Sequence, residues 1–337
     1  MERKNFITLD LNESYYFLDG KILNKFKKFD YSVLSLYPEY DQLTKMLSKY
    51  AGCKEENICL TNGSDRGIQM LLNLFFKAKD EVVVPSPTFS VYFSVLKEIG
   101  VKPKMLKYKL KDKKFLFPFE ETLKSLNTNC KGLLLCNPNN PLGSSISQKQ
   151  IEMMIKKAKS LSIPVLIDEA YFEFSKKTSL SLLSKYNNVI ILRTFSKAFG
   201  LAGLRLGYIM AHKSIIQKVE ELKLAWSVNH FAVHAGEIVL KNLPYFKNKI
   251  KRAIKIKKEF IIHLQKTGLK CLDTEANFIL IKSTKNNLPE LFKSKRILVK
   301  DLSKYPFQNG LLNHTVRANI PSEKDLKYIK RVLKKNN

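Results

Sequence analysis

The chain has 337 residues, of which 45% are hydrophobic, which is enough for two lobes with substantial cores. No apolar run approaches the roughly 20 residues that a membrane-spanning helix needs, and the N-terminus has no secretory pattern. We therefore expect a cytoplasmic protein that does not span a membrane. Its five cysteines lack paired spacing, which predicts free thiols and no metal site.

The formal net charge of +29 raises the question of nucleic-acid binding. Only eight of the 59 basic residues are arginine, so 51 are lysine, and they are spread along the whole chain. In the segment 248–266, lysine alternates with isoleucine as on a helix with one wet face. The sequence contains no helix-turn-helix, zinc-finger or RNA-binding motif. We expect no nucleic-acid partner, and interpret the charge as attraction for small anionic substrates.

From about residue 30 the chain alternates helical patterns with short runs rich in Val, Ile and Leu. These runs occupy residues 56–61, 80–86, 131–137, 163–170, 188–193 and 205–211. Such runs are typical of strands buried on both faces of a mostly parallel sheet that helices sandwich. Ligands bind beyond the carboxyl ends of these strands, where Asn137, Asp168, Ser196 and Lys197 fall.

After about residue 235 the pattern changes. A long basic helix is followed by strand-like runs at 276–282, 296–301 and 314–320 and by a closing helix. This order predicts a smaller α+β domain over 236–337, next to a large domain over 30–235.

Residues 193–208, RTFSKAFGLAGLRLGY, place Lys197 directly after a buried strand. A lysine there can be partly desolvated, which lowers its pKa and frees the amine to form a Schiff base. Most of the 51 lysines must be ordinary surface residues, but Lys197 has distinctive neighbours: Ser196, Gly200, Gly203, Arg205 and Gly207. The window resembles the cofactor-lysine motif of fold-type I pyridoxal-phosphate aminotransferases, in particular the histidinol-phosphate aminotransferase branch.

The resemblance covers almost the whole chain and is densest from 131 to 211. It implies the fold-type I α/β architecture, with a seven-stranded, mostly parallel sheet in the large domain. It also implies that residues 1–29 pack with 236–337, which makes the small domain discontinuous. Pyridoxal phosphate would be the cofactor, and a homodimer would share its active sites.

The resemblance assigns residues to the cofactor ring. Asp168, at a predicted strand end, would keep the pyridine nitrogen protonated, although a loop Asp would look similar. Tyr171 and Asn140, the latter in CNPNNPLG, would contact the phenolic oxygen. Phe89 would stack on the ring where the branch commonly has Tyr, unless it is simply a core residue.

The cofactor phosphate would bind at a helix start in TNGSDRG, where free backbone N–H groups and the helix dipole favour an anion. A Gly-Ser-Asp turn alone is more often an ordinary helix cap. The resemblance assigns this phosphate to Ser64, Asp65, Ser196 and Arg205, and to Tyr37 from the partner subunit. Arg66 stands where the family usually has Glu.

The substrate side departs from the family. The resemblance implies that Arg317 clamps the substrate carboxylate and that Asn12 and Asn140 lie near the substrate. Lys300 stands where the branch usually has an Arg for the substrate phosphate, and the interval to Arg317 is longer by about four residues. We infer a phosphorylated or otherwise anionic small substrate, not necessarily histidinol phosphate.

The sequence therefore predicts an aminotransferase with pyridoxal phosphate that moves an amino group between an amino acid and a small phosphorylated oxo compound. The product could be an amino alcohol phosphate. Lys197, Asp168 and Tyr171 would be catalytic, with Lys197 as the base that moves the substrate proton. Two alternatives stay open: a decarboxylase of a phospho-amino acid such as phosphoserine or phosphothreonine, and a binding protein without catalysis.

Overall fold

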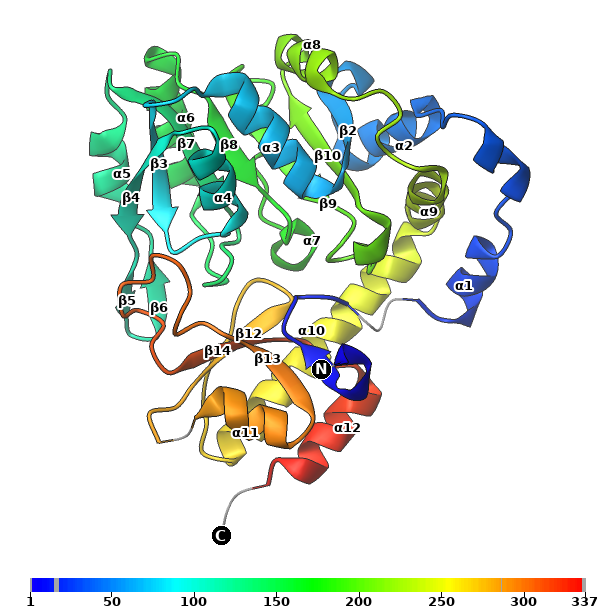
Figure 1. Cartoon of the computed structure of the whole chain (residues 1–337), viewed down its shortest axis with the longest axis vertical. Helices are drawn as coiled ribbons and strands as arrows, with labels where there is room; N and C mark the ends of the chain where they lie inside the picture. The colour runs from blue at the N-terminus through cyan, green and yellow to red at the C-terminus, as the bar shows by residue number, and fades with distance from the viewer. Residues whose placement is uncertain (1, 15–17, 286, 335–337) are drawn as a thin grey trace.

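The computed structural model describes residues 2–14, 18–285 and 287–334, which form a large lobe and a small lobe (Figure 1). The sheet of the large lobe has seven strands in the order β2-β10-β9-β8-β7-β3-β4, and β10 alone runs antiparallel to its neighbours. In that order the strands are Ile58–Asn62, Leu206–Ala211, Val189–Thr194, Val165–Asp168, Cys130–Cys136, Glu81–Ser86 and Lys102–Lys107. This confirms the predicted fold class.

Alternate residues of these strands face two layers of helices. Leu133, Val165 and Ile191 pack in one core with residues of α2, α6 and α9, whereas Leu134 and Leu192 pack in a second core with α3, α4 and α8. The helix bounds are α2 Asp41–Ala51, α3 Gly63–Phe75, α4 Val91–Glu98, α5 Phe119–Ser125, α6 Gln148–Ser160, α8 Lys213–Leu222 and α9 His230–Lys241. Burial on both faces explains why these strands are continuous apolar runs.

The small lobe contains a five-stranded sheet in the order β1-β13-β14-β12-β11. In that order the strands are Ile7–Leu9, Ile297–Asp301, Thr315–Asn319, Phe278–Lys282 and Lys270–Leu272. The strand β1 pairs in parallel with β13, so the N-terminus joins this sheet. The helices of this region are α10 Leu243–Lys266, α11 Leu288–Ser294 and α12 Glu323–Val332.

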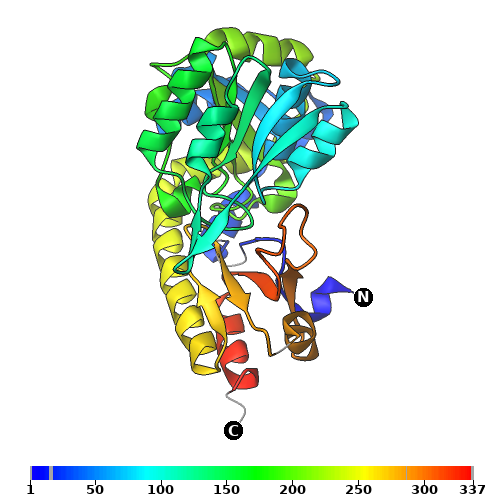
Figure 2. The same cartoon turned by 90° about the vertical axis from the view of Figure 1, so that its left-hand side faces the viewer.

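The N-terminal and connecting segments link the lobes. Helix α1 (Gly20–Phe26) packs against α9, and α10 runs from the large lobe to the small one (Figure 2). The predicted boundary at 235/236 falls inside α9, and the domain bounds stay a prediction. The remaining short elements are η1 Arg3–Asn5, η2 Tyr31–Ser35, η3 Glu55–Asn57, β5 Lys109–Lys111, β6 Lys114–Leu116, α7 Phe172–Ser175, η4 Leu180–Leu182 and η5 Ala202–Leu204.

The cysteines form no disulfide bonds, because all five of them are free thiols. Within residues 2–14, 18–285 and 287–334, no helix combines the length and the apolar character needed to cross a membrane.

The start of α3 lies directly against β10, and Gly207 makes this close approach possible. A Cβ atom at Gly207 would lie 2.5 Å from the Ser64 nitrogen and 2.6 Å from the Gly63 carbonyl carbon. Backbone atoms cannot move aside as a flexible side chain can. The first turn of α3 therefore depends on a glycine in the neighbouring strand.

We expect Gly207→Ala to lower the free energy of unfolding by about 1–3 kcal/mol, the usual effect of forcing a methyl group into a packed site. Gly203→Ala is the matched control, because a Cβ there would meet nothing within 4 Å. Chemical denaturation measures both. Equal stability of the two variants would contradict the packing described here.

Candidate active site

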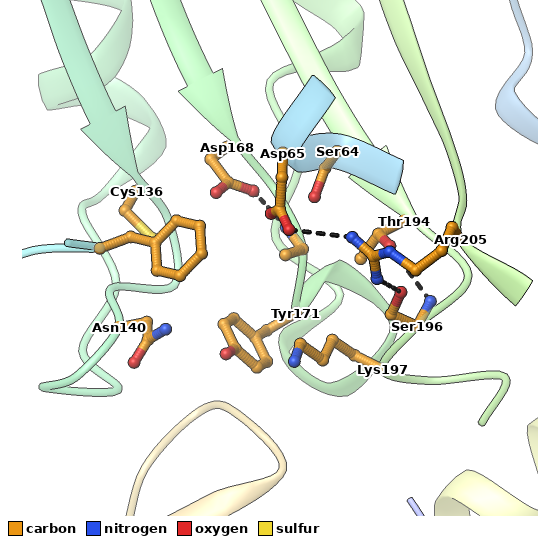
Figure 3. Close-up of a pocket in the computed structure, with 12 residues that line it drawn as sticks. Ser64, Asp65, Cys136, Asn140, Asp168, Tyr171, Thr194, Ser196, Lys197 and Arg205 are labelled. Atoms are coloured by element: carbon orange, nitrogen blue, oxygen red, sulfur yellow. Dashed lines mark hydrogen bonds and ion pairs between the residues drawn. The ribbon is translucent and has the colours of Figure 1, made fainter. Parts of the chain in front are cut away.

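A pocket with an empty volume of about 480 Å³ lies at the carboxyl ends of β7, β8 and β9 (Figure 3). Its wall combines strand ends with the first turn of α3 and with the loops that follow β7, β8 and β9. The lining residues are Ser64, Asp65, Phe89, Cys136, Asn140, Asp168, Ala170, Tyr171, Thr194, Ser196, Lys197 and Arg205. Nine of the residues predicted for the cofactor are therefore brought together, although their individual roles stay proposals.

One end of the pocket is suited to an anion. The Arg205 guanidinium donates to Asp65 Oδ2 at 2.9 Å and to Ser196 Oγ at 3.4 Å. Beside it, the first turn of α3 presents its N-terminus, and the N-cap residue Asn62 makes no side-chain bond to the helix. Gly63 has φ +75°, and a Cβ there would lie 2.5 Å from Arg205 Nη2. Glycine thus lets the guanidinium lie against the helix start.

The Asp168 carboxyl is the acidic group of the pocket floor. It is 3% exposed, and burial raises its pKa to about 6. Its Oδ1 accepts from the Ala170 N–H at 3.0 Å, and its Oδ2 accepts from the Tyr92 hydroxyl at 3.1 Å. Tyr92 itself is buried in α4. Both bonds favour the ionised carboxylate against the effect of burial.

Lys197 follows β9 and is partly buried. Burial lowers its pKa to about 8, and the positive charges of Arg317 and Arg205 act in the same direction. Its Nζ donates to the Leu11 carbonyl at 3.4 Å. Roughly a tenth of this amine is therefore neutral at pH 7, far more than for a lysine with the ordinary pKa, and the neutral form is the one that a nucleophile or base requires.

The predicted substrate residues Arg317 and Asn12 lie beside the pocket. Arg317 Nη1 donates to Asn140 Oδ1 at 2.5 Å, so it is adjacent to a residue of the pocket wall. Asn12 Nδ2 donates to the Tyr171 hydroxyl at 2.9 Å. Burial raises the pKa of Tyr171, and its hydroxyl stays protonated at neutral pH.

Lys300 lies directly opposite Arg317 in the β13–β14 pair and is exposed. Opposite residues of an antiparallel pair project from the same face of the sheet, so the two cations are neighbours. Tyr37 is not in the pocket of its own chain: it is 71% exposed and stacks on Trp226 with ring centroids 4.1 Å apart. Arg66 also lies outside the pocket wall and bonds to Gln69 at 2.7 Å.

Four residues of the site were not predicted from the sequence. Cys136, Ala170 and Thr194 line the pocket, and Tyr92 supports Asp168. Cys136 and Thr194 are the last residues of β7 and β9, so their position at strand ends could have indicated them. Tyr92 gave no such signal, because its contact depends on how α4 packs.

The pocket fits pyridoxal phosphate. Its anion-binding end matches the phosphate, because Gly63 lets the Arg205 guanidinium lie against the start of α3 and Gly207 lets α3 lie close to β10. The buried Asp168 can pair with a protonated ring nitrogen, and Lys197 supplies an amine for the aldehyde.

The comparisons with known proteins agree with this geometry. The family model described as aminotransferase class I and II matches residues 4–333. The chain belongs to this family. Its members use pyridoxal phosphate, and the enzyme described here is a pyridoxal-phosphate-dependent aminotransferase of fold type I.

Several relatives of this aminotransferase are close enough to compare. A protein from Caldanaerobacter subterraneus subsp. tengcongensis that is named as a threonine-phosphate decarboxylase is 35% identical over 285 residues, 81% of this chain and 76% of the relative. The histidinol-phosphate aminotransferase of Ruminiclostridium cellulolyticum is 32% identical over 320 residues, covering 92% and 88%. The crystal structure of the Clostridium acetobutylicum histidinol-phosphate aminotransferase superposes with a TM-score of 0.87, at 25% identity and with 97% and 98% covered.

The lowered pKa of Lys197 gives a testable pH dependence. Only the neutral amine can attack the cofactor aldehyde, so the rate of cofactor capture by the apoenzyme should rise with pH and level off above about 8. With an unperturbed lysine, this rate would continue to rise until the pH reached about 10.5. The appearance of visible absorbance after mixing measures the rate, and continued increase beyond pH 9 would contradict the assignment.

Tyr92→Phe tests the support of Asp168. Without the hydroxyl donor the pKa of Asp168 rises further, because the ionised form loses a hydrogen bond. As the pH is lowered, both enzymes should lose affinity for the cofactor. We expect this loss to occur at a pH about one unit higher in the variant than in the wild type. Fluorescence titration at several pH values measures this. Tyr186→Phe is the control, because it removes a hydroxyl that donates to Glu152. It should not shift the pH dependence of cofactor affinity.

Proposed function

We propose that this aminotransferase transfers an amino group between an amino acid and a small phosphorylated oxo compound. The observation that carries the proposal is the pairing of Lys300 with Arg317 across β13 and β14. Arg317 is buried beside Asn140 and suits a carboxylate, whereas Lys300 is exposed next to it and suits a phosphate. These two cationic side chains, on one face of the small sheet, would together bind a small anionic substrate.

In the proposed mechanism each residue has a limited task. When bound, pyridoxal phosphate supplies the electron-accepting ring on which the amino group is exchanged. Asp168 holds a proton on the ring nitrogen, and the Asn140 amide and Tyr171 hydroxyl orient the ring oxygen. Lys197 Nζ moves the proton from the substrate carbon, which its lowered pKa allows near neutral pH. Ser64, Asp65, Ser196 and Arg205 hold the cofactor phosphate, and Phe89 packs on the ring.

A homodimer is part of the proposal. Exposed apolar side chains cluster in sequence around η2 and around the segment between α8 and α9; they include Tyr31, Leu34, Leu36, Tyr37, Leu224 and Trp226. A monomer rarely exposes so many large apolar side chains together. A partner subunit would cover them, and Tyr37 would then reach the phosphate of the partner's cofactor. The cytoplasmic location likewise stays a prediction from the sequence.

A second candidate function is decarboxylation of a phospho-amino acid. The relative named as a threonine-phosphate decarboxylase, at 35% identity, supports this alternative. The identical cofactor residues would serve both reactions, since the choice depends on which substrate bond lies perpendicular to the cofactor ring. The histidinol-phosphate aminotransferase that covers 92% of this chain supports transamination.

The products distinguish the two reactions. We expect an amino donor, added to the holoenzyme without an acceptor, to convert bound pyridoxal phosphate into pyridoxamine phosphate. Phosphorylated ketones should then restore the original spectrum, which identifies the acceptor. Release of carbon dioxide from phosphoserine or phosphothreonine, without pyridoxamine phosphate, would instead establish the decarboxylase.

Lys300 should affect only substrates with a phosphate. We expect Lys300→Ala to raise the KM of the phosphorylated acceptor about tenfold, the loss of one charge-assisted hydrogen bond, and to leave the KM of an unphosphorylated amino donor unchanged. Lys293→Ala, which removes an exposed lysine of α11, is the matched control. An equal rise in the KM of both substrates would contradict the assignment of Lys300 to the proposed phosphate site.

A further inference from the structure

Residues 302–314, here called the β13–β14 loop, join the two strands that carry the proposed substrate cations. Figure 1 and Figure 2 both show this loop reaching from the small lobe towards the large one. Gln308 holds the loop together from within, because its Nε2 donates to the Ser303 carbonyl at 2.9 Å and to Asn313 Oδ1 at 3.0 Å. The loop therefore has a defined conformation of its own.

The β13–β14 loop is also docked on the large lobe. Ser86, the last residue of β3, donates through its Oγ to the Phe307 carbonyl at 3.3 Å. The Phe307 ring packs on Phe93 of α4, with the ring centroids 4.4 Å apart. Ser86 and Phe93 stand on either side of Phe89 in the sequence, and Phe89 lines the pocket. The loop thus contacts the segment that carries the ring assigned to cofactor stacking.

A buried tyrosine of this loop, Tyr305, lies beside the proposed substrate site. It is 9% exposed and belongs to the same core as Tyr171 of the pocket wall. Its hydroxyl interacts with Ser90, the residue after Phe89, and with the positive charge of Arg317. Tyr305 is therefore placed between the cofactor-stacking segment and the proposed carboxylate clamp.

The surroundings of Arg317 leave little room for a ligand. Its side chain is buried, and the ring of Phe278 lies 5.4 Å from its Cζ. One N–H of each terminal nitrogen is used, for Asn140 and for the Asp10 carbonyl, so that Nε and one N–H on each terminal nitrogen remain.

The shape of the anion decides how it meets these donors. A planar carboxylate can accept two of them within the plane of the guanidinium. A phosphonate or phosphate is tetrahedral, so its third oxygen lies outside that plane and needs additional space. A wall beside the guanidinium therefore discriminates between the two kinds of anion.

We propose that the ring of Tyr305 is this wall, a specificity-determining element that limits the anionic group at Arg317 to the size of a carboxylate. The inference rests on the proposed role of Arg317 as the carboxylate clamp. It distributes the two anions of the proposed substrates, because the carboxylate is taken by Arg317 and the phosphate is left to the exposed Lys300. The β13–β14 loop would then set which anion goes to which cation.

The test compares two probes that carry the same ethyl group, propionate and ethylphosphonate, in slightly acidic buffer where both are monoanions. Titration against the visible absorbance of the holoenzyme gives a dissociation constant for each. We expect the wild type to prefer propionate, and Tyr305→Ala to reduce this preference at least about tenfold, the lower end of discrimination by pocket shape. Tyr305→Phe keeps the ring and should keep the preference.

Tyr328→Ala is the matched control. Tyr328 is also a tyrosine of the small lobe, but it belongs to α12, and its hydroxyl donates to the Lys295 carbonyl at 3.2 Å. Its removal should leave both dissociation constants unchanged. If Tyr305→Ala does not fold, Tyr305→Leu provides the same comparison.

Two results would overturn the inference. One is a preference for propionate that is unchanged in Tyr305→Ala, because a loop that is merely loosened alters both dissociation constants by the same factor. The other is an equal loss of preference in Tyr305→Phe, because the hydroxyl and not the ring would then discriminate.

Arg317→Lys distinguishes these failures from failure of the proposed function. It should weaken propionate binding, because lysine cannot make the bidentate contact. The ethylphosphonate affinity gained in Tyr305→Ala should also disappear in Tyr305→Ala/Arg317→Lys, and its persistence would contradict the inference. If Arg317→Lys leaves propionate binding unchanged, the carboxylate clamp is misplaced, and the proposed substrate site fails together with the role of Tyr305.

Discussion

The site depends on a buried ion pair between Arg193 and Glu169 on the side of the sheet that faces away from the pocket. The Arg193 guanidinium lies 2.9 Å from Glu169 Oε2, and both side chains are almost fully buried. Glu169 directly follows Asp168, and Arg193 precedes Lys197 by four residues. The pair therefore joins the ends of β8 and β9, the two strands that carry the acid and the amine. Removal of one partner would leave an uncompensated buried charge, which typically costs about 3–5 kcal/mol.

With these strand ends fixed, burial shifts the two catalytic groups in opposite directions. It raises the pKa of Asp168 and lowers that of Lys197, because desolvation disfavours the charged form of each. For Asp168 the hydrogen bonds from Ala170 and Tyr92 limit the shift. For Lys197 the neighbouring cations add to it. The fold thus provides an amine that can be neutral and a carboxylate that can remain charged, close together in one pocket.

Much of this was predictable from the sequence, for physical reasons. Strands buried on both faces must be apolar, so the central strands and the residues at their carboxyl ends could be found directly. Strand β4 could not, because it is an edge strand in which lysine at 102, 104 and 107 breaks the apolar pattern. The Tyr92–Asp168 bond depends on helix packing, and the pairing of Lys300 with Arg317 depends on strand register across a long loop. Local sequence patterns record neither.

The assignment of Lys197 is the claim on which the rest of the account depends. Reduction of the holoenzyme with borohydride fixes the cofactor covalently on the amine that carries it, and peptide mapping by mass spectrometry then locates that amine among the 51 lysines. The account predicts a single modified peptide with the cofactor on Lys197. Stoichiometric modification of a different lysine would contradict it.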